Sequence, residues 1–260
     1  MVEPANRDNG DGNGDEAARG DGAAHGDGID LTSRWEQDAT TEGAARETAV
    51  PAIEARGLGC LTRRGWVYRD VGVRAESGTV VAVVGPAGSG RSALLLTLTG
   101  RMAATTGQLR VFGRALPEQA SDVRAVTAVA TLNEHVGFDA TQLVSEAVGE
   151  HLTFTGNRRG GFDRFAELSE VVGFTGRLHQ QVHELSAIEA TLLHLAVAAL
   201  GRPDLIVLDD ADRGLMPAEH ARIWAAIRAL ASSGPAIVAS TTATVEDHQA
   251  VHRIDLSTQA

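Results

Sequence analysis

The sequence contains no lysine, so all 23 of its basic residues are arginines. It also has a single cysteine, Cys60, and only 4% aromatic residues. One cysteine excludes an intrachain disulfide framework and is typical of a reducing compartment. We therefore expect Cys60 to be a small buried side chain near a strand. The core is expected to consist mainly of alanine, valine, leucine and isoleucine.

Long apolar runs are absent as well. The longest candidate, residues 191–200, is shorter than the ~18 apolar residues that a membrane-spanning helix needs. The amino terminus has neither the basic nor the apolar region of a secretory signal. The sequence thus predicts no membrane span, and any involvement with a membrane must come through a partner chain.

Positive charge is scarce, and the formal net charge is −11. Residues 1–50 hold 12 acidic residues and 4 arginines, whereas residues 51–260 hold 22 and 19. The first segment has too few apolar residues to form a core, so we expect a disordered acidic tail. The domain expected at residues 51–260 is nearly neutral, which argues against a nucleic-acid-binding face.

From residue 51 onward, the apolar pattern predicts strands that alternate with helices, which is typical of a mainly parallel α/β sheet. Strands are expected at residues 52–55, 66–74, 79–84, 108–112, 126–131, 205–208 and 236–240. Helices are expected from Gly90 to about residue 100 and at residues 142–151, 163–173, 191–200 and 218–230.

A glycine-rich turn follows the apolar strand at residues 79–84. Its residues match the phosphate-binding pattern G-x-x-x-x-G-K-[ST], with arginine in place of lysine. Glycines let such a loop turn its backbone N–H groups toward one anion, and the helix that follows adds partial positive charge. The predicted nucleotide-binding residues of this loop are Gly85, Pro86, Ala87, Gly88, Ser89, Gly90, Arg91, Ser92 and Ala93.

Two acidic residues, Asp209 and Asp210, follow the apolar run at residues 205–208. Mg²⁺ prefers oxygen ligands, so the Ser92 hydroxyl and the Asp209 carboxylate are the predicted metal ligands. Asp210 would face the attacking water as the candidate base. The alternative reading is an acidic turn that ends a strand, which the upstream phosphate loop disfavours.

The segment LSAIEATLLHLAVAALGRPDLIVLDD, residues 185–210, resembles the segment from the LSGGQ signature to the Walker B strand in ATP-binding cassette (ABC) ATPases. The stretches SALLLTLTGRMAATTGQLRVFGRAL and FAELSEVVGFTGRLHQQVHELS resemble the flanking parts of the same family. The resemblance spans residues 53 to about 256. It implies a P-loop NTPase (RecA-like) core, an antiparallel β subdomain and a small helical subdomain at about 136–187. It also implies ATP and Mg²⁺ as ligands, with Ser186 contacting a nucleotide held by a partner cassette.

Several positions depart from the family pattern. Arg91 replaces the loop lysine, and its planar guanidinium differs from a compact ammonium. Ala187, Ile188 and Glu189 replace the two glycines and the glutamine of the signature. Asp210 is one methylene shorter than the catalytic glutamate, and Thr242 replaces the switch histidine.

Two further family positions are unfilled or ambiguous. The glutamine expected near the end of strand 126–131 is replaced by Leu132 or Asn133. No clear adenine-stacking tyrosine precedes the second strand. Trp66 or Tyr68 could serve, but the favoured interpretation of both is ordinary strand aromatics in a sheet. A separate pair, His248 and His252, has the spacing of one helical face, and without a third ligand we interpret it as part of a surface helix.

The resemblance implies the ATP-binding subunit of an ABC transporter, coupled to a separate membrane permease and paired with a second cassette as a homo- or heterodimer. Such a subunit is cytoplasmic and lies at the inner face of the membrane through its partner. The departures predict slow ATP hydrolysis. The alternative is a non-transport regulatory or scaffolding ABC protein that binds ATP and hardly hydrolyses it. A DNA-repair ABC ATPase is disfavoured by the lack of long heptad repeats and zinc-type cysteine pairs.

Overall fold

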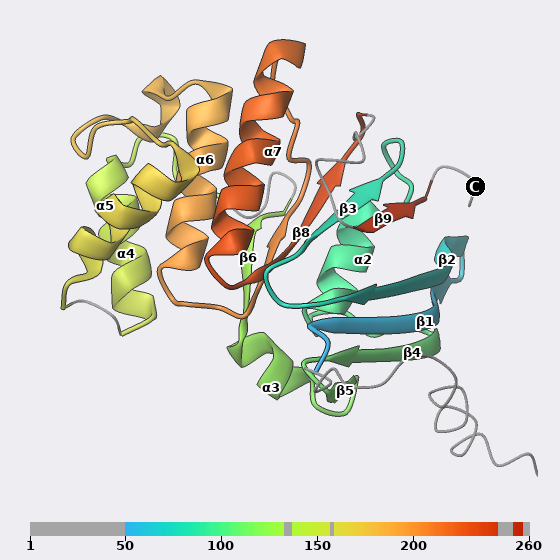
Figure 1. The fold of residues 1–260 in the computed structure, drawn as a ribbon. Helices are drawn as coiled ribbons and strands as arrows, with labels where there is room; N and C mark the ends of the chain where they lie inside the picture. Colours follow the sequence, from blue (N-terminus) through green and yellow to red (C-terminus); the bar gives the residue numbers. More distant parts are fainter. Residues whose placement is uncertain (1–49, 133–136, 157–158, 244–251, 257–260) are drawn as a thin grey trace, which may run out of the picture. The chain divides into compact units, whose positions relative to one another are not determined.

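The computed structural model describes residues 50–132, 137–156, 159–243 and 252–256 (Figure 1). The predicted acidic tail, Asn133 and His248 lie outside the described residues. The described part contains two sheets with helices between and beside them.

The central sheet has five parallel strands in the order β6-β7-β8-β3-β9. Its three inner strands are buried along their whole length, as parallel strands are when helices cover both faces of the sheet. The carboxyl ends of β3, β7 and β8 meet at one edge of the sheet, where ligands bind in open α/β sheets. The strands are β3 (Val80–Val84), β6 (Thr127–Thr131), β7 (Leu205–Leu208), β8 (Ala236–Thr241) and β9 (His252–Asp255).

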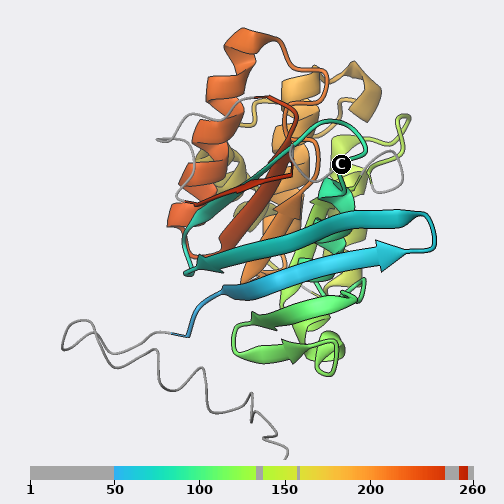
Figure 2. The same cartoon turned by 90° about the vertical axis from the view of Figure 1, so that its right-hand side faces the viewer.

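The second sheet is antiparallel, with the strand order β2-β1-β4-β5. Its strands are β1 (Ile53–Thr62), β2 (Gly65–Ala75), β4 (Thr106–Val111) and β5 (Arg114–Leu116). Figure 2 shows this sheet face-on, in front of the central sheet. Cys60 lies on β1 and is buried, as predicted.

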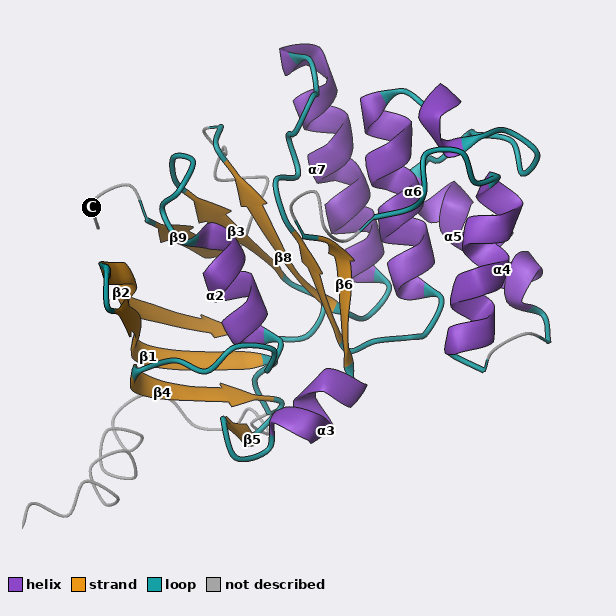
Figure 3. Cartoon of the chain, turned by 180° about the vertical axis from the view of Figure 1, so that it is seen from behind, coloured by secondary structure: helices purple, strands orange, loops and turns teal. Residues whose placement is uncertain are grey.

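Helix α2 (Arg91–Leu98) lies between the two sheets (Figure 3). Its buried leucines pack in one cluster with side chains from both sheets, and this cluster fixes the start of the helix beside β3. The opposite face of the central sheet is covered by α6 (Ala187–Ala199) and α7 (Pro217–Ser232). Helix α5 (Gly161–Val172) packs against α6, helix α4 (Val144–Phe154) packs against α5, and α3 (Ala120–Ala125) precedes β6.

The predicted fold class, a P-loop core with an antiparallel β subdomain, is confirmed. Strand 205–208 has the predicted bounds, whereas α3, β5 and β9 were not predicted. Helix α6 begins at Ala187 instead of residue 191, because Ser186 caps it: the Ser186 hydroxyl accepts a hydrogen bond from the Glu189 N–H, and the Glu189 carboxylate accepts one from the Ser186 N–H. None of the helices in the described ranges is long and apolar enough to cross a membrane.

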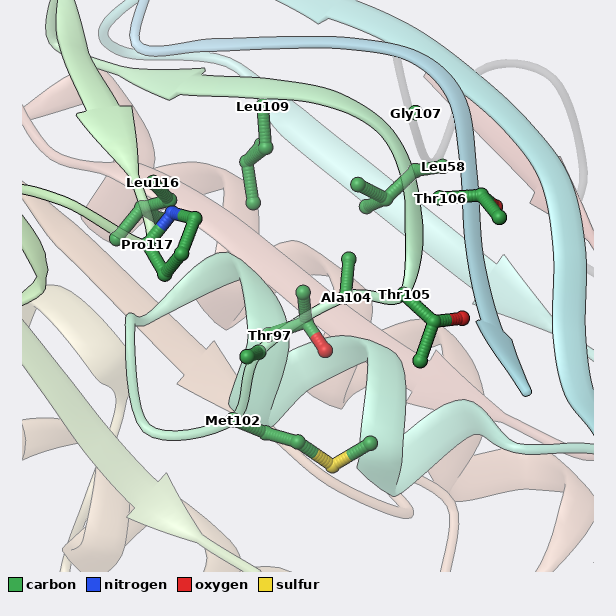
Figure 4. Close-up of a pocket in the computed structure, with 11 residues that line it drawn as sticks. Leu58, Thr97, Met102, Ala104, Thr105, Thr106, Gly107, Leu109, Leu116 and Pro117 are labelled. Atoms are coloured by element: carbon green, nitrogen blue, oxygen red, sulfur yellow. The ribbon is translucent and has the colours of Figure 1, made fainter. Parts of the chain in front are cut away.

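A small cavity of about 90 Å³ lies beneath the antiparallel sheet (Figure 4). No charged side chain lines it. Leu58 and Leu109 come from the sheet, Thr97 from α2, and Met102 and Ala104 from the loop after α2. A cavity of this size and character has no group for a phosphate and is far too small for a nucleotide. We interpret it as a packing gap between the sheet and α2.

Tyr68, the only tyrosine of the chain, is fully buried on β2. Its hydroxyl lies 2.7 Å from the Thr97 hydroxyl, whose own proton is donated to the Ala93 carbonyl, so Tyr68 is the donor. Burial raises the pKa of Tyr68 to about 12. A buried neutral phenol therefore contributes to stability below pH 10, and this contribution is lost as the pH rises toward 12.

We expect the folded chain to show little tyrosinate absorbance at pH 11, because ionisation requires exposure of Tyr68. In denaturant the same titration should have its midpoint near pH 10. The stability lost between the two values is about 2–3 kcal/mol. A spectrophotometric titration with parallel circular dichroism checks this, and a midpoint near pH 10 in the folded chain would contradict it.

Candidate functional site

Residues 85–90 form a tight turn between β3 and α2. The Gly85 N–H donates to the Thr241 carbonyl, which attaches the start of the turn to the neighbouring strand β8. Gly90 precedes α2 with a φ of 91° and leaves the first turn of the helix without a side-chain cap. Backbone N–H groups at such an uncapped helix start are available to an anion. The turn therefore leads into a helix start that has no side-chain cap.

Glycine at position 90 is required by space as well as by backbone angle. A β-carbon there would collide with the backbone carbonyl oxygen of Val67 on β2. Gly88 has a similar φ of 81°, yet a β-carbon at that position would meet no atom within 4 Å. Gly90 is therefore required both by the lack of space and by its backbone angle, whereas Gly88 is required by its backbone angle alone.

Arg91 is the first residue of α2, and its side chain is only 8% exposed. Its Nη2 lies 2.6 Å from Oδ1 of Asp210. Its Nη1 is buried and has no hydrogen-bond partner among the described residues, and the same holds for the Ser89 hydroxyl. Buried donors without partners are costly. A phosphate group in the loop would supply acceptor oxygens, so the residues present fit such a ligand.

Asp209 is 3% exposed and receives two hydroxyl hydrogen bonds. Ser92 donates to its Oδ2 and Ser240 donates to its Oδ1, both at 2.5 Å. Ser240 is the last residue but one of β8, so three neighbouring strand ends of the sheet bring these groups together. Sequence reasoning missed Ser240, although its place at the end of an apolar strand on the same sheet edge is a usable signal.

The Asp210 backbone lies in the left-handed region, with a φ of 48°. Its N–H donates to the Ser240 hydroxyl oxygen at 2.8 Å, and its carboxylate contacts Arg91. Burial raises the pKa of Asp210, and the positive charge of Arg91 opposes that shift. A left-handed aspartate costs on the order of 1 kcal/mol, so the surrounding contacts must hold it in place.

The described residues contain no cluster of three or more His, Cys, Asp or Glu side chains that could hold a metal. Mg²⁺ needs no such cluster, because it commonly keeps several waters and takes phosphate oxygens as ligands. The Ser92 hydroxyl and the Asp209 carboxylate already lie in hydrogen-bond contact. The residues therefore fit a magnesium ion that is completed by water and nucleotide oxygens.

Ser186, the predicted signature residue, lies at the start of α6 and is exposed. Its side chain bonds to Glu189, and in the described part of the chain it shares no hydrogen bond with the loop at 85–93. Beside it, a cavity of about 310 Å³ has Asp209 and Asp210 on one wall and Ala187 and His194 of α6 on another. The first turn of α6 therefore faces the same open space as the two acids.

Thr242, at the predicted histidine position, is bound to Asp212. Its hydroxyl donates to Oδ2 of Asp212 at 3.0 Å, and the Ala243 N–H donates to the same oxygen at 3.1 Å. The sequence did not single out Asp212. Asp212 therefore holds the start of the segment after β8 through these two hydrogen bonds, although this segment has no histidine at position 242.

The structure places three further residues that the sequence singled out, together with His252. Tyr68 is buried against α2 and cannot stack on a nucleotide base, whereas Trp66 is 42% exposed. Leu132 forms an isolated bridge at the end of β6. His252 begins strand β9, so the helix expected for His248 and His252 is wrong at His252.

Comparisons with known proteins agree with this geometry. The family model "ABC transporter" matches residues 68–213. A Streptomyces coelicolor protein named as an ABC transporter ATP-binding protein is 30% identical over 230 residues, covering 87% of this chain and 40% of that protein. The zinc transport system ATP-binding protein TroB of Treponema pallidum is 27% identical, covering 72% of this chain and 71% of its own. This chain thus spans two fifths of the length of the first relative.

Solved structures show the same fold at low sequence identity. An ATP-binding cassette of an ABC transporter in its ADP conformation has a TM-score of 0.64 at 16% identity and covers 79% of this chain and 87% of its own. The cassette cbiO1 from Clostridium perfringens, described as part of the transporter complex cbiONQ, has a TM-score of 0.63 at 17% identity and covers 79% and 84%.

Proposed function

This chain belongs to the ABC transporter family through its ATP-binding domain, and we propose that it is a nucleotide-binding subunit that binds Mg·ATP and hydrolyses it slowly. The observation that carries the proposal is the arrangement of Arg91, Ser92, Asp209 and Asp210 at one sheet edge, beside a loop with unpartnered buried donors. Two acids and two loop residues from distant parts of the sequence meet there.

In the proposed reaction, the loop N–H groups and Arg91 bind the phosphates and orient them. A magnesium ion held by Ser92 and Asp209 would neutralise phosphate charge. Asp210 would accept a proton from the attacking water, a role for which a pKa raised by burial is suitable. Ser240 orients Asp209 by its hydrogen bond to Oδ1.

Three features of the chain support the proposal that hydrolysis is slow. Arg91 binds Asp210 directly, so the candidate base must first be released from this contact before it can face the attacking water. Thr242 has no group that can take up and release a proton near neutral pH, and it is bonded to Asp212. The signature positions carry Ala187, a buried Ile188 and Glu189, and Glu189 adds negative charge where a partner's phosphate would approach.

The proposed partners are a second cassette, identical or different, and a membrane permease in a separate chain. The relatives support this by name: cbiO1 is described as part of a transporter complex, and another solved neighbour is described as a dimeric ABC transporter cassette. We therefore propose a place at the inner face of the membrane through the permease.

Phosphate release by the purified chain tests the proposal. We expect labelled ATP to bind with Mg²⁺ and phosphate release to be slow but above that of Asp209→Asn. Release that rises when a permease encoded beside this gene is added would support transport. Binding without release above the Asp209→Asn control would instead favour the regulatory protein. Rapid hydrolysis that Asp210→Asn abolishes would contradict the claim of slow turnover.

A further inference from the structure

The cation of the phosphate loop is already bonded to a carboxylate of the same chain. Nη2 of Arg91 lies 2.6 Å from Oδ1 of Asp210, and the two side chains are 8% and 26% exposed. A contact this short between a guanidinium and a carboxylate is a charge-assisted hydrogen bond, which is about twice as strong as a neutral one. Because the pair is partly shielded from water, screening by salt is weaker than at the surface.

Both residues are held in this contact by their surroundings. Arg91 follows Gly90, whose position is fixed against Val67, and it starts a helix that is buried between the two sheets. Asp210 has a left-handed backbone that its N–H bond to Ser240 supports. The backbone next to both residues is therefore constrained, which limits where the two side chains can lie.

The proposed metal ligands, Ser92 and Asp209, are likewise bonded to side chains of the same protein. The Ser92 hydroxyl proton is donated to Asp209, which also receives the Ser240 hydroxyl. Apart from Nη1 of Arg91 and the Ser89 hydroxyl, the side chains proposed to receive phosphate and metal thus satisfy one another. A ligand that also binds Nη2 of Arg91, Ser92 or Asp209 must replace existing bonds.

From this geometry we propose that Asp210 is an internal competitor for the nucleotide: its carboxylate occupies Arg91, and a phosphate group binds by taking its place. The inference rests on the proposed nucleotide-binding function. Nη1 has no partner among the described residues and can receive a phosphate oxygen, but a phosphate that binds the planar fork through both Nη1 and Nη2 meets the Asp210 carboxylate already bound at Nη2. An Asp210 left in place would also repel the phosphate. Release from Arg91 is then the step that frees Asp210 to face water, so binding and activation of the base are one event.

A double-mutant cycle separates this competition from simple repulsion. The probe is a non-hydrolysable ATP analogue with Mg²⁺, so that slowed hydrolysis cannot mimic tighter binding. We expect Asp210→Asn to tighten binding about tenfold in the chain with Arg91, and less than about twofold in an Arg91→Ala background. Asp212→Asn, an equal change of charge at a carboxylate that binds Thr242 and Ala243, is the matched control with an expected change below about twofold.

Equal tightening in both backgrounds would show repulsion alone and overturn the competition, as would no tightening with Arg91 present. If neither the unmodified chain nor Asp210→Asn binds the analogue, the proposed function itself fails. Should Asp210→Asn not fold, the smaller Asp210→Ser carries the same expectations, with folding followed by thermal unfolding.

Discussion

A Gly90→Ala chain should lose Mg·ATP binding and unfold more easily than the unmodified chain by more than about 3 kcal/mol. The added methyl group would collide with the Val67 carbonyl oxygen, and the φ of 91° is strained for any residue with a β-carbon. Because the Val67 carbonyl oxygen belongs to the backbone of β2, it cannot rotate away as a side chain could, so the loop or the strand must move. Isothermal titration with ATP and thermal unfolding measure the two effects.

Gly88→Ala is the matched control for this prediction. Its φ of 81° imposes a similar conformational strain, but the new methyl group would meet open space. We expect a loss of about 1 kcal/mol and folded protein that still binds nucleotide. Equal losses in the two variants would contradict the steric argument and leave only the backbone angle as the cause.

Asp209→Asn should abolish the magnesium dependence of nucleotide binding, with a loss of about a hundredfold in affinity when Mg²⁺ is present. The amide removes the negative charge that a hard cation requires. It also has one acceptor oxygen for two donating hydroxyls, so either Ser92 or Ser240 loses its partner. Titrations with and without Mg²⁺ should then give the same affinity in the variant and different affinities in the unmodified chain.

Asp122→Asn provides the comparison for Asp209→Asn, because it makes the same chemical change at an exposed residue of α3. We expect it to change neither stability by more than about 0.5 kcal/mol nor the response to Mg²⁺. A magnesium effect that persists in Asp209→Asn would show that another group holds the metal, and it would remove Asp209 from the proposed ligands.

The features predicted well from the sequence are those that depend on short, contiguous patterns. The run of four apolar residues before Asp209 predicted the bounds of β7. A parallel strand that is buried on both faces is apolar along its whole length, so it ends where the polar residues begin. The glycines of the loop likewise indicated a tight turn, and Gly88 and Gly90 do have left-handed backbones. Both signals are local, and tertiary contacts only reinforce them.

The features that sequence reasoning missed depend on contacts between distant segments. Tyr68 is buried and Trp66 exposed although alternation would place them on one face. The pairing of β1 with β2 shifts register between Cys60, which faces Tyr68, and Leu61, which faces Trp66. The Arg91–Asp210 pair joins residues 119 positions apart. No spacing rule could show that the loop cation and the candidate base would bind each other.

Ser240 bonds differently to the two consecutive aspartates, Asp209 and Asp210. A hydroxyl has one proton, and Ser240 gives it to Asp209, while its oxygen accepts the N–H of Asp210. Ser240 therefore bonds to the carboxylate of Asp209 but only to the main-chain N–H of Asp210, whose carboxylate is bound by Arg91 instead. Consecutive aspartates thus become chemically unlike through a residue about thirty positions further along the chain, and Ser240→Ala should make them more alike.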